Sequence, residues 1–227
     1  MVEKDIFAQD PHAVIIGVDE VGRGALAGPI AGGAVAITKN IFDILSVAQE
    51  QEGIIVRDSK KMTAKQRVKT AEWLEKHCVH TVFREHATSI DRKGIQMCNN
   101  AVLVGSIKGV VQNILSNGES HESIHVFCDY FPLKKIKVET SGAENYDVTE
   151  LTITTMKFGE SHSIAIAAAS ILAKVRRDAY MIQLGEKYPE YEWGKNKGYG
   201  TQSHRDAIKK YGLHLQHRVT FCGKLSK

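Results

Sequence analysis

Four acidic residues stand where an α/β protein would gather its chemistry. Asp19 and Glu20 follow the apolar run AVIIGV, and Asp129 follows the run SIHVFC. Glu160 comes directly before an alanine-rich stretch that is typical of a long helix. Because active sites in open α/β sheets form at the carboxyl ends of strands, these carboxylates are candidates for one site. Taken singly, each acid is better explained as a surface cap, and Glu160 would favour a helix N-terminus in any case.

Carboxylates brought together repel one another unless something neutralises them. Two unit charges roughly 4 Å apart cost about 4 kcal/mol at an effective dielectric constant of about 20. Protonation or a bound cation relieves that cost, and oxygen-only ligands favour hard cations such as Mg²⁺ or Mn²⁺. A pair of such ions can activate water and stabilise the leaving oxygen in an in-line attack on phosphate. Metal-dependent phosphodiester chemistry is therefore the hypothesis, although spacing alone does not establish it.

The basic residues are informative through their distribution. A formal charge of +4, from 30 basic and 26 acidic residues, is too small to establish nucleic-acid binding. Several basic clusters near the acidic motifs could converge on a phosphate backbone, although each one alone is explained as a solvated face. These clusters are Lys60-Lys61, Lys174 with Arg176 and Arg177, and Lys195 with Lys197.

Apolar periodicity and turn residues predict strands and helices in mixed order without repeats or a dividing linker. One α/β domain over 1–227 is expected, with a mixed sheet, a core of about 13–211 and a C-terminal tail over 212–227. Strands are predicted over 13–18, 29–37, 80–86 and 121–128, with a hairpin over 134–155 that turns at 141–145. Helices are predicted over 63–77, over 94–115, from about Ser161 to Leu184, and after Thr201; Asn117-Gly118 closes the second of them. A loop is predicted over 49–61, and helix or coil after Tyr211.

Several classes of protein are disfavoured by the sequence. No apolar run is long enough to cross a bilayer, and the N-terminus lacks a secretory pattern, so a cytoplasmic protein is expected. Four cysteines without a C-x-x-C pair are interpreted as buried thiols, and they are Cys78, Cys98, Cys128 and Cys222. His214 and His217 lack the Glu and the spacing of a zinc-protease helix.

Five segments of the chain resemble, in order, those of ribonuclease HII (type 2 ribonuclease H). The first and fourth are long and specific, and the matches extend over most of the chain. The segments are GVDEVGRGALAGP (17–29), RDSKKMTAKQR (57–67), FCDYF (127–131), FGESHSIAIAAASILAKVRRD (158–178) and NKGYGTQSH (196–204).

The resemblance implies a ribonuclease H-like fold, a central mixed β-sheet flanked by helices with a C-terminal helical segment. It implies divalent metal, Mg²⁺ or Mn²⁺, held by Asp19, Glu20, Asp129 and Glu160. The implied reaction is cleavage of the RNA strand of RNA–DNA hybrids. It includes a cut 5′ to single ribonucleotides in duplex DNA, leaving a 5′-phosphate and a 3′-hydroxyl.

Residues outside the acidic set also match positions of the family. The resemblance implies that Gly22, Arg23 and Gly24 contact the ribonucleotide 2′-hydroxyl through their backbone, and glycines allow that close approach. It further implies that Ser59 and Lys60 contact phosphates. Arg23 favours type 2 over the related type 3 enzymes.

The last matching segment contributes an aromatic residue and a histidine. The resemblance implies that Tyr199 stacks on the neighbouring deoxyribose. His204 either assists product release or packs, and the packing interpretation is slightly favoured.

Three features depart from the common family pattern. Glu160 stands where many members have Asp, and its extra methylene alters the distances at the second metal. Tyr130-Phe131 replaces a common glycine and would narrow the floor of the groove. The stretch 134–155 is longer than in compact members and has no assigned task.

Three other functions have partial support in the sequence. A dinucleotide-binding oxidoreductase is suggested by the glycines of 22–28, but Pro29 and a β-like run follow where that fingerprint needs a helix. A hybrid-binding module without catalysis would have no reason to gather acids beside phosphates. A nucleophilic Cys128 has no evident histidine partner. A monomer is expected, and the sequence names no protein partner.

Overall fold

The computed structural model describes residues 1–116, 123–129, 134–141, 146–223 and 225. Within these residues the strands form one sheet in the order β3-β2-β1-β4-β6-β5. The strands are β1 (Val14–Val21), β2 (Ile30–Ile37), β3 (His80–Glu85), β4 (Ile124–Cys128), β5 (Lys135–Ser141) and β6 (Tyr146–Thr155). The helices are α1 (Val2–Gln9), α2 (Lys39–Gln51), α3 (Ala64–His77), α4 (Ala87–Lys93), α5 (Ile95–Ser116), α6 (Gly159–His162), α7 (Ile164–Lys187), α8 (Trp193–Asn196), α9 (Gln202–Tyr211) and α10 (Val219–Cys222), with 3₁₀ turns η1 (Ser59–Lys61) and η2 (Pro189–Tyr191).

The sheet is mixed, as the sequence predicted. β1 pairs antiparallel with β2, and β2 pairs antiparallel with β3. On its other side β1 pairs parallel with β4, which in turn pairs parallel with β6. Because β1 and β4 are parallel neighbours, their carboxyl ends, where the acidic residues lie, are at the same end of the sheet.

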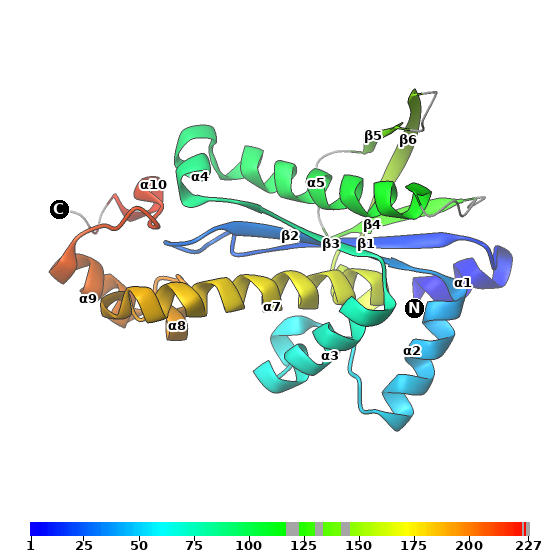
Figure 1. Cartoon of the computed structure of the whole chain (residues 1–227), viewed down its shortest axis with the longest axis horizontal. Helices are drawn as coiled ribbons and strands as arrows, with labels where there is room; N and C mark the ends of the chain where they lie inside the picture. The colour runs from blue at the N-terminus through cyan, green and yellow to red at the C-terminus, as the bar shows by residue number, and fades with distance from the viewer. Residues whose placement is uncertain (117–122, 130–133, 142–145, 224, 226–227) are drawn as a thin grey trace.

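Two long helices cover the two faces of the sheet, α5 on one and α7 on the other (Figure 1). Side chains alternate along a strand, so the even-numbered apolar residues of β1 join the α5 core and Ile15 joins the α7 core. Gly17 lets α7 approach closely, because a Cβ there would lie 1.9 Å from the carbonyl carbon of Ala165. Asp19, two residues further along the same face, therefore points toward α7.

The structure corrects several predicted boundaries. β1 does not end before Asp19, because its pairing with β2 continues through Val21 opposite Ala31. The helix predicted from Ser161 is divided into α6 and α7 at Ser163, whose side chain accepts a hydrogen bond from the N–H of Ile166 and caps α7. The predicted loop 49–61 is wrong at both ends, since α2 continues through Gln51 and η1 occupies 59–61.

Among the described residues, four helices were not predicted, namely α1, α2, α4 and α8. α2 has a cap that could have been recognised, because the Thr38 side chain accepts from the N–H of Ile41. α1 is held by its buried Glu3, whose Oε1 accepts from the Ser163 hydroxyl at 2.6 Å, and only the tertiary structure brings these residues together.

The predicted hairpin is confirmed as β5 and β6. Residues 142–145 of its predicted turn, the Asn117-Gly118 stop and the Tyr130-Phe131 pair lie outside the described residues. No helix in the described part of the chain has both the length and the apolar character needed to cross a membrane.

Candidate active site

The four predicted carboxylates come from three elements that meet at the end of β1. Asp19 and Glu20 are the sixth and seventh residues of β1, and Asp129 directly follows β4, its parallel neighbour. Glu160 lies in α6, just before α7. A Cβ built on Gly159 would lie 3.3 Å from the Asp129 Cβ, so the α6 segment passes directly beside Asp129.

The acids affect one another's protonation. Burial, followed by the negative charges of Glu20 and Glu160, raises the pKa of Asp19 to about 8. Burial also raises the pKa of Glu20, and Asp129 adds to that effect while Arg23 opposes it. The structure therefore places like charges where only a proton or a cation can offset them, with Asp19 only 7% exposed.

The η1 turn binds the fourth acid through its main chain and a lysine. The N–H of Ser59 donates to Glu160 Oε2 at 2.8 Å, and Lys60 Nζ lies 3.2 Å from Glu160 Oε1. Burial lowers the pKa of Lys60, but Glu160 and then Asp19 more than reverse this, so the pKa is raised overall. Lys60 therefore stays charged beside the acids.

Two residues that the sequence interpretation missed support this turn. The Ser59 and Ser170 hydroxyls are 2.9 Å apart, which joins η1 to α7. Arg67 Nη1 donates to the carbonyl oxygens of Ser59 at 2.9 Å and Met62 at 2.5 Å. Ser170 sits four residues before Lys174 on α7, so helical spacing from Lys174 was the available sequence signal.

A small cavity of about 160 Å³ opens beside the acids. Its lining comes from β1, η1, α3, α7 and the loop before α9. The lining residues are Asp19, Glu20, Val21, Ser59, Lys60, Arg67, Ser170, Lys174 and Tyr199. Predicted phosphate-contacting and stacking residues thus share one cavity with two of the four carboxylates.

Tyr199 is flanked by cations. Lys174 Nζ lies 5.6 Å from the centre of its ring and the guanidinium carbon of Arg177 lies 5.3 Å from it. The backbone of Tyr199 is fixed by His204, whose Nδ1–H donates to the Tyr199 carbonyl at 3.0 Å.

His204 belongs to a buried pair of histidines. Its Nε2 accepts from Trp193 Nε1–H at 3.0 Å and lies 3.1 Å from Nε2 of His217. His217 Nδ1 accepts from the N–H of His214 at 2.8 Å, so its Nε2 carries the proton and donates to His204. This network satisfies each ring nitrogen of the pair and supports the packing interpretation of His204.

The glycine-rich loop after β1 is held by two buried arginines. Arg177 donates to the carbonyl oxygens of Pro29 at 2.8 Å and Ala27 at 3.2 Å, and Arg218 donates to those of Gly28 at 3.1 Å and Arg23 at 2.9 Å. Gly22 has φ 86°, and a Cβ there would lie 2.1 Å from Arg177 Nε. Because Arg177 is fully buried, it positions the loop, and neither interpretation of its cluster, phosphate contact or solvated face, holds for this residue.

Arg23 itself is exposed and has two partners. Its Nη2 donates to Gln96 Oε1 at 3.1 Å, and its Nη1 lies 3.9 Å from Glu20 Oε1. The side chain is therefore directed along the edge of the carboxylate site.

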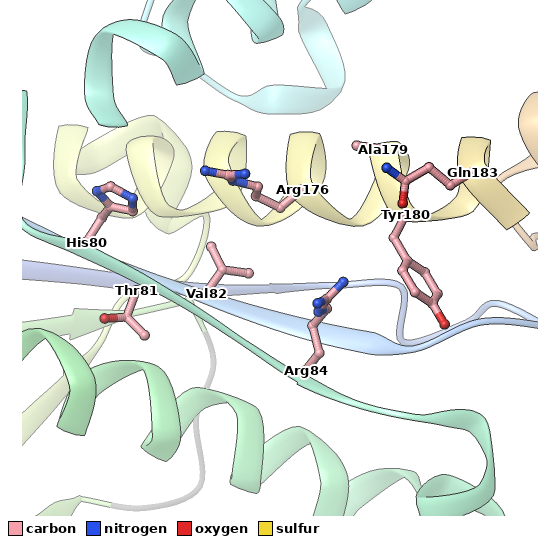
Figure 2. A pocket seen from close by; sticks show the side chains of 8 residues that line it. All are labelled: His80, Thr81, Val82, Arg84, Arg176, Ala179, Tyr180 and Gln183. Atoms are coloured by element: carbon pink, nitrogen blue, oxygen red, sulfur yellow. The ribbon is translucent and has the colours of Figure 1, made fainter. Parts of the chain in front are cut away.

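A second, larger cavity of about 480 Å³ lies between β3 and α7 (Figure 2). It is lined by no carboxylate, and its two arginines already have neighbours. Arg176 Nε is 2.7 Å from Glu75 Oε1, and the Arg84 guanidinium carbon lies 5.1 Å from the centre of the Tyr180 ring. Its size alone does not make it the reactive site.

The cysteines behave as predicted from the sequence. Cys78, Cys98, Cys128 and Cys222 are free and buried. Burial, and after it Asp19, raises the pKa of Cys128 well above the usual thiol value, which keeps it protonated and unsuited to nucleophilic attack.

The donors suit a hard divalent cation by their chemistry. Every candidate ligand is a carboxylate oxygen, and the raised pKa of Asp19 is the effect that a nearby cation would reverse. In the described part of the chain, no three His, Cys, Asp or Glu side chains are already grouped tightly enough to hold an ion. Asp19, Glu20, Asp129 and Glu160 remain the predicted ligands.

Known proteins support the same interpretation. The ribonuclease HII of Wolbachia sp. subsp. Brugia malayi is 39% identical over 208 residues, which cover 92% of this chain and 87% of that protein. The ribonuclease HII of Clostridium acetobutylicum is 35% identical over 214 residues, covering 92% and 72% of the two chains.

Solved structures share the fold. The ribonuclease H2 from Pyrococcus horikoshii OT3 matches with a TM-score of 0.66 and 24% identity, covering 94% of this chain and 97% of that one. Bst-RNase HIII, solved in complex with Mn²⁺, matches with a TM-score of 0.68 and 18% identity over 96% of this chain and 71% of that one. At these identities the matches establish the ribonuclease H-like fold.

The family model described as Ribonuclease HII spans residues 16–224, which include all four carboxylates, the η1 turn and the Tyr199 loop. With these matches in sequence and fold, the chain belongs to the ribonuclease HII family.

Proposed function

We propose that this chain cuts on the 5′ side of single ribonucleotides embedded in duplex DNA as well as along RNA–DNA hybrids, leaving a 5′-phosphate and a 3′-hydroxyl. Family membership carries the reaction class, since ribonuclease HII is an endoribonuclease that acts on RNA–DNA hybrids. In this proposal residues 1–227 act as one catalytic domain and as a monomer. In this proposal the protein acts in the cytoplasm.

Asp19, Glu20, Asp129 and Glu160 hold Mg²⁺ or Mn²⁺ in this proposal. The observation that carries it is the burial of Asp19 beside two other acids, which raises its pKa to about 8. When bound, such ions activate water and neutralise charge on the scissile phosphate.

The remaining residues bind and orient the substrate. Lys60, charged and 83% exposed at its side chain, is suited to a phosphate oxygen. The 22–24 backbone, held by the Arg218 hydrogen bond to the Arg23 carbonyl, is suited to the 2′-hydroxyl that distinguishes RNA from DNA. Tyr199, held by His204, is suited to packing on the sugar that follows.

The decisive assay uses a duplex with one ribonucleotide inside a DNA strand, with Mg²⁺, with Mn²⁺ and with chelator. The expected result is a single cut 5′ to the ribonucleotide that chelator abolishes. Cleavage of long RNA–DNA hybrids alone would support the nuclease assignment and would show that Arg23 and Tyr199 do not confer specificity for single ribonucleotides. Binding without any cleavage, unaffected by Mg²⁺, would favour the non-catalytic hybrid-binding module.

Two variants refine the assignment. Arg23→Ala is expected to lower the preference for a single ribonucleotide, because it removes the side chain next to Glu20 and Gln96. Tyr199→Ala is expected to lower the same preference with little change in metal dependence, because its ring faces Lys174 and Arg177.

A further inference from the structure

Phe158 combines two unfavourable features next to the carboxylates. Its backbone has φ 58° and ψ 40°, in the left-handed region that bulky residues avoid. Its side chain is 77% exposed, so burial offsets almost none of that strain. An exposed, strained aromatic residue requires a reason beyond the folding of the free chain.

The backbone here does not need an aromatic side chain. Phe158 precedes α6, and its carbonyl oxygen accepts from the N–H of Ser161 at 2.9 Å. Glycine makes the same main-chain bond and adopts positive φ without strain. The local fold therefore accounts for the conformation of Phe158 and leaves the identity of its side chain unexplained.

The position of Phe158 relates it to the carboxylate site. Its segment runs beside the end of β4, because the N–H of Met156 donates to the Cys128 carbonyl at 2.9 Å. The next residue, Gly159, approaches Asp129, and the residue after that is the buried Glu160. Phe158 thus belongs to the segment that passes beside Asp129, whereas Tyr199 lies by Lys174 and Arg177 of α7.

We propose that Phe158 is a substrate-binding residue, which packs its ring against the apolar face of a sugar or base in the nucleotides flanking the cut. This inference rests on the proposed function and adds a contact to it. An uncharged ring cannot attract phosphate, whereas every nucleotide presents apolar faces on which aromatic rings stack. Contact with the substrate would bury the ring that the free protein exposes.

The test compares Phe158→Ala, Phe158→Tyr and Phe158→Gly with the wild type. Binding of a labelled RNA–DNA hybrid is measured by fluorescence anisotropy in chelator, and cleavage is measured with Mg²⁺. Phe158→Ala should bind about tenfold more weakly and raise KM with kcat within about twofold, as loss of one stacking contact implies. Phe158→Tyr should retain most of the affinity.

Two readouts separate this role from a structural one. Phe158→Gly removes the left-handed strain, so it should unfold at a temperature no lower than the wild type while losing affinity as the Ala variant does. The salt dependence of binding should stay unchanged in all three variants, because the ring neutralises no phosphate. Val47→Ala, at a 51% exposed apolar residue of α2, is the matched control and should bind like the wild type.

Unchanged affinity of Phe158→Ala and Phe158→Gly would overturn the inference, and so would a loss of affinity that Phe158→Tyr shares in full. The proposed function is judged separately by the wild type, because its failure would appear as no cleavage of either substrate. If the wild type cleaves and the Phe158 variants bind equally well, the proposed nuclease function stands and the substrate-binding role of Phe158 is rejected.

Discussion

The main-chain N–H of Ser59 donates to Glu160 Oε2 at 2.8 Å across 101 residues of sequence. The bond ties the turn that carries Lys60 to the fourth carboxylate, so a predicted phosphate-binding residue and a predicted metal ligand are positioned together. Because the donor is a backbone group, it orients Glu160 whatever side chain occupies position 59. The longer side chain of Glu, compared with the commoner Asp, reaches this donor from α6.

Glu160→Gln should keep the Ser59 bond and lose the charge. Its amide oxygen can still accept from the Ser59 N–H, so the fold should be retained. The Mg²⁺ concentration for half-maximal cleavage should rise about tenfold or more, as losing an anionic ligand implies. A metal titration of the cleavage rate measures this, with Glu75→Gln as the control because Glu75 pairs with Arg176 away from the site. An unchanged titration would remove Glu160 from the metal site.

Asp19→Asn should abolish most cleavage and leave hybrid binding nearly intact. Losing several kcal/mol of transition-state stabilisation corresponds to a fall in kcat of about a hundredfold or more. The unfolding temperature without metal should not fall, because Asn replaces a carboxyl group whose charged form is disfavoured by burial and by Glu20 and Glu160. Single-turnover cleavage and anisotropy binding provide the two measurements. Normal cleavage by this variant would show the carboxylate assignment to be wrong.

Lys60→Met should weaken hybrid binding in a salt-dependent manner. If Lys60 neutralises one phosphate, the slope of log affinity against log salt should decrease in magnitude by about 1. Lys61→Met is a matched control, because Lys61 is the adjacent lysine and its Nζ lies 3.6 Å from Asp58. Binding isotherms from low to high salt distinguish the two. Equal slopes for Lys60→Met and the wild type would mean that Lys60 serves only to orient Glu160.

The histidine pair should make stability fall in acid. Burial, with His204 beside it, lowers the pKa of His217 from 6.5 to about 4, so the unfolded chain binds more protons between those values. This contribution is present above pH 6.5 and is lost as pH falls toward 4, by at most about 3 kcal/mol. Asp19 acts in the opposite direction because its pKa is raised.

His217→Gln isolates this effect. The difference in unfolding free energy between wild type and variant should shrink from pH 7 to pH 4.5, while the Asp19 contribution cancels between them. Urea unfolding at both pH values measures the difference. A pH-independent difference for His217→Gln would mean that the pair is not held neutral.

Arg218→Met should loosen the glycine-rich loop. The change removes hydrogen bonds to the carbonyl oxygens of Gly28 and Arg23 from a fully buried guanidinium. Burial, followed by Arg177, lowers the pKa of Arg218 to about 9, so part of the lost bonding is offset by relief of a buried charge. A stability loss of about 1–3 kcal/mol is expected, with a larger fall in single-ribonucleotide cutting than in hybrid cleavage.

Parallel cleavage assays on a single-ribonucleotide duplex and on an RNA–DNA hybrid measure the effect of Arg218→Met. Arg84→Met is the control, since Arg84 stacks on Tyr180 in the cavity between β3 and α7. This substitution should change little either the stability or the ratio of single-ribonucleotide cutting to hybrid cleavage. Equal falls on both substrates would indicate that the loop does not read the ribonucleotide.

The sequence by itself determined the elements whose patterns are local. The apolar run before Asp19 gave β1, the Thr63 and Gln66 capping box gave the start of α3, and alternation gave the β5–β6 hairpin. These features depend on neighbouring residues alone, which is why they could be read without tertiary contacts. The acidic residues and the five family-like segments likewise indicated the residues of the candidate site.

Only the tertiary structure decided what surrounds those residues. α1 stays in place through Glu3 on Ser163, and Arg177 reaches carbonyl groups about 150 residues away in place of a phosphate. The raised pKa of Asp19 depends first on burial, which the packing of α7 provides; the adjacent Glu20 adds to it locally, and the distant Glu160 adds to it only in the folded chain. A local pattern sets the conformation of a segment, but hydrogen bonds and charge–charge effects between distant segments exist only once the sheet and α7 have packed together.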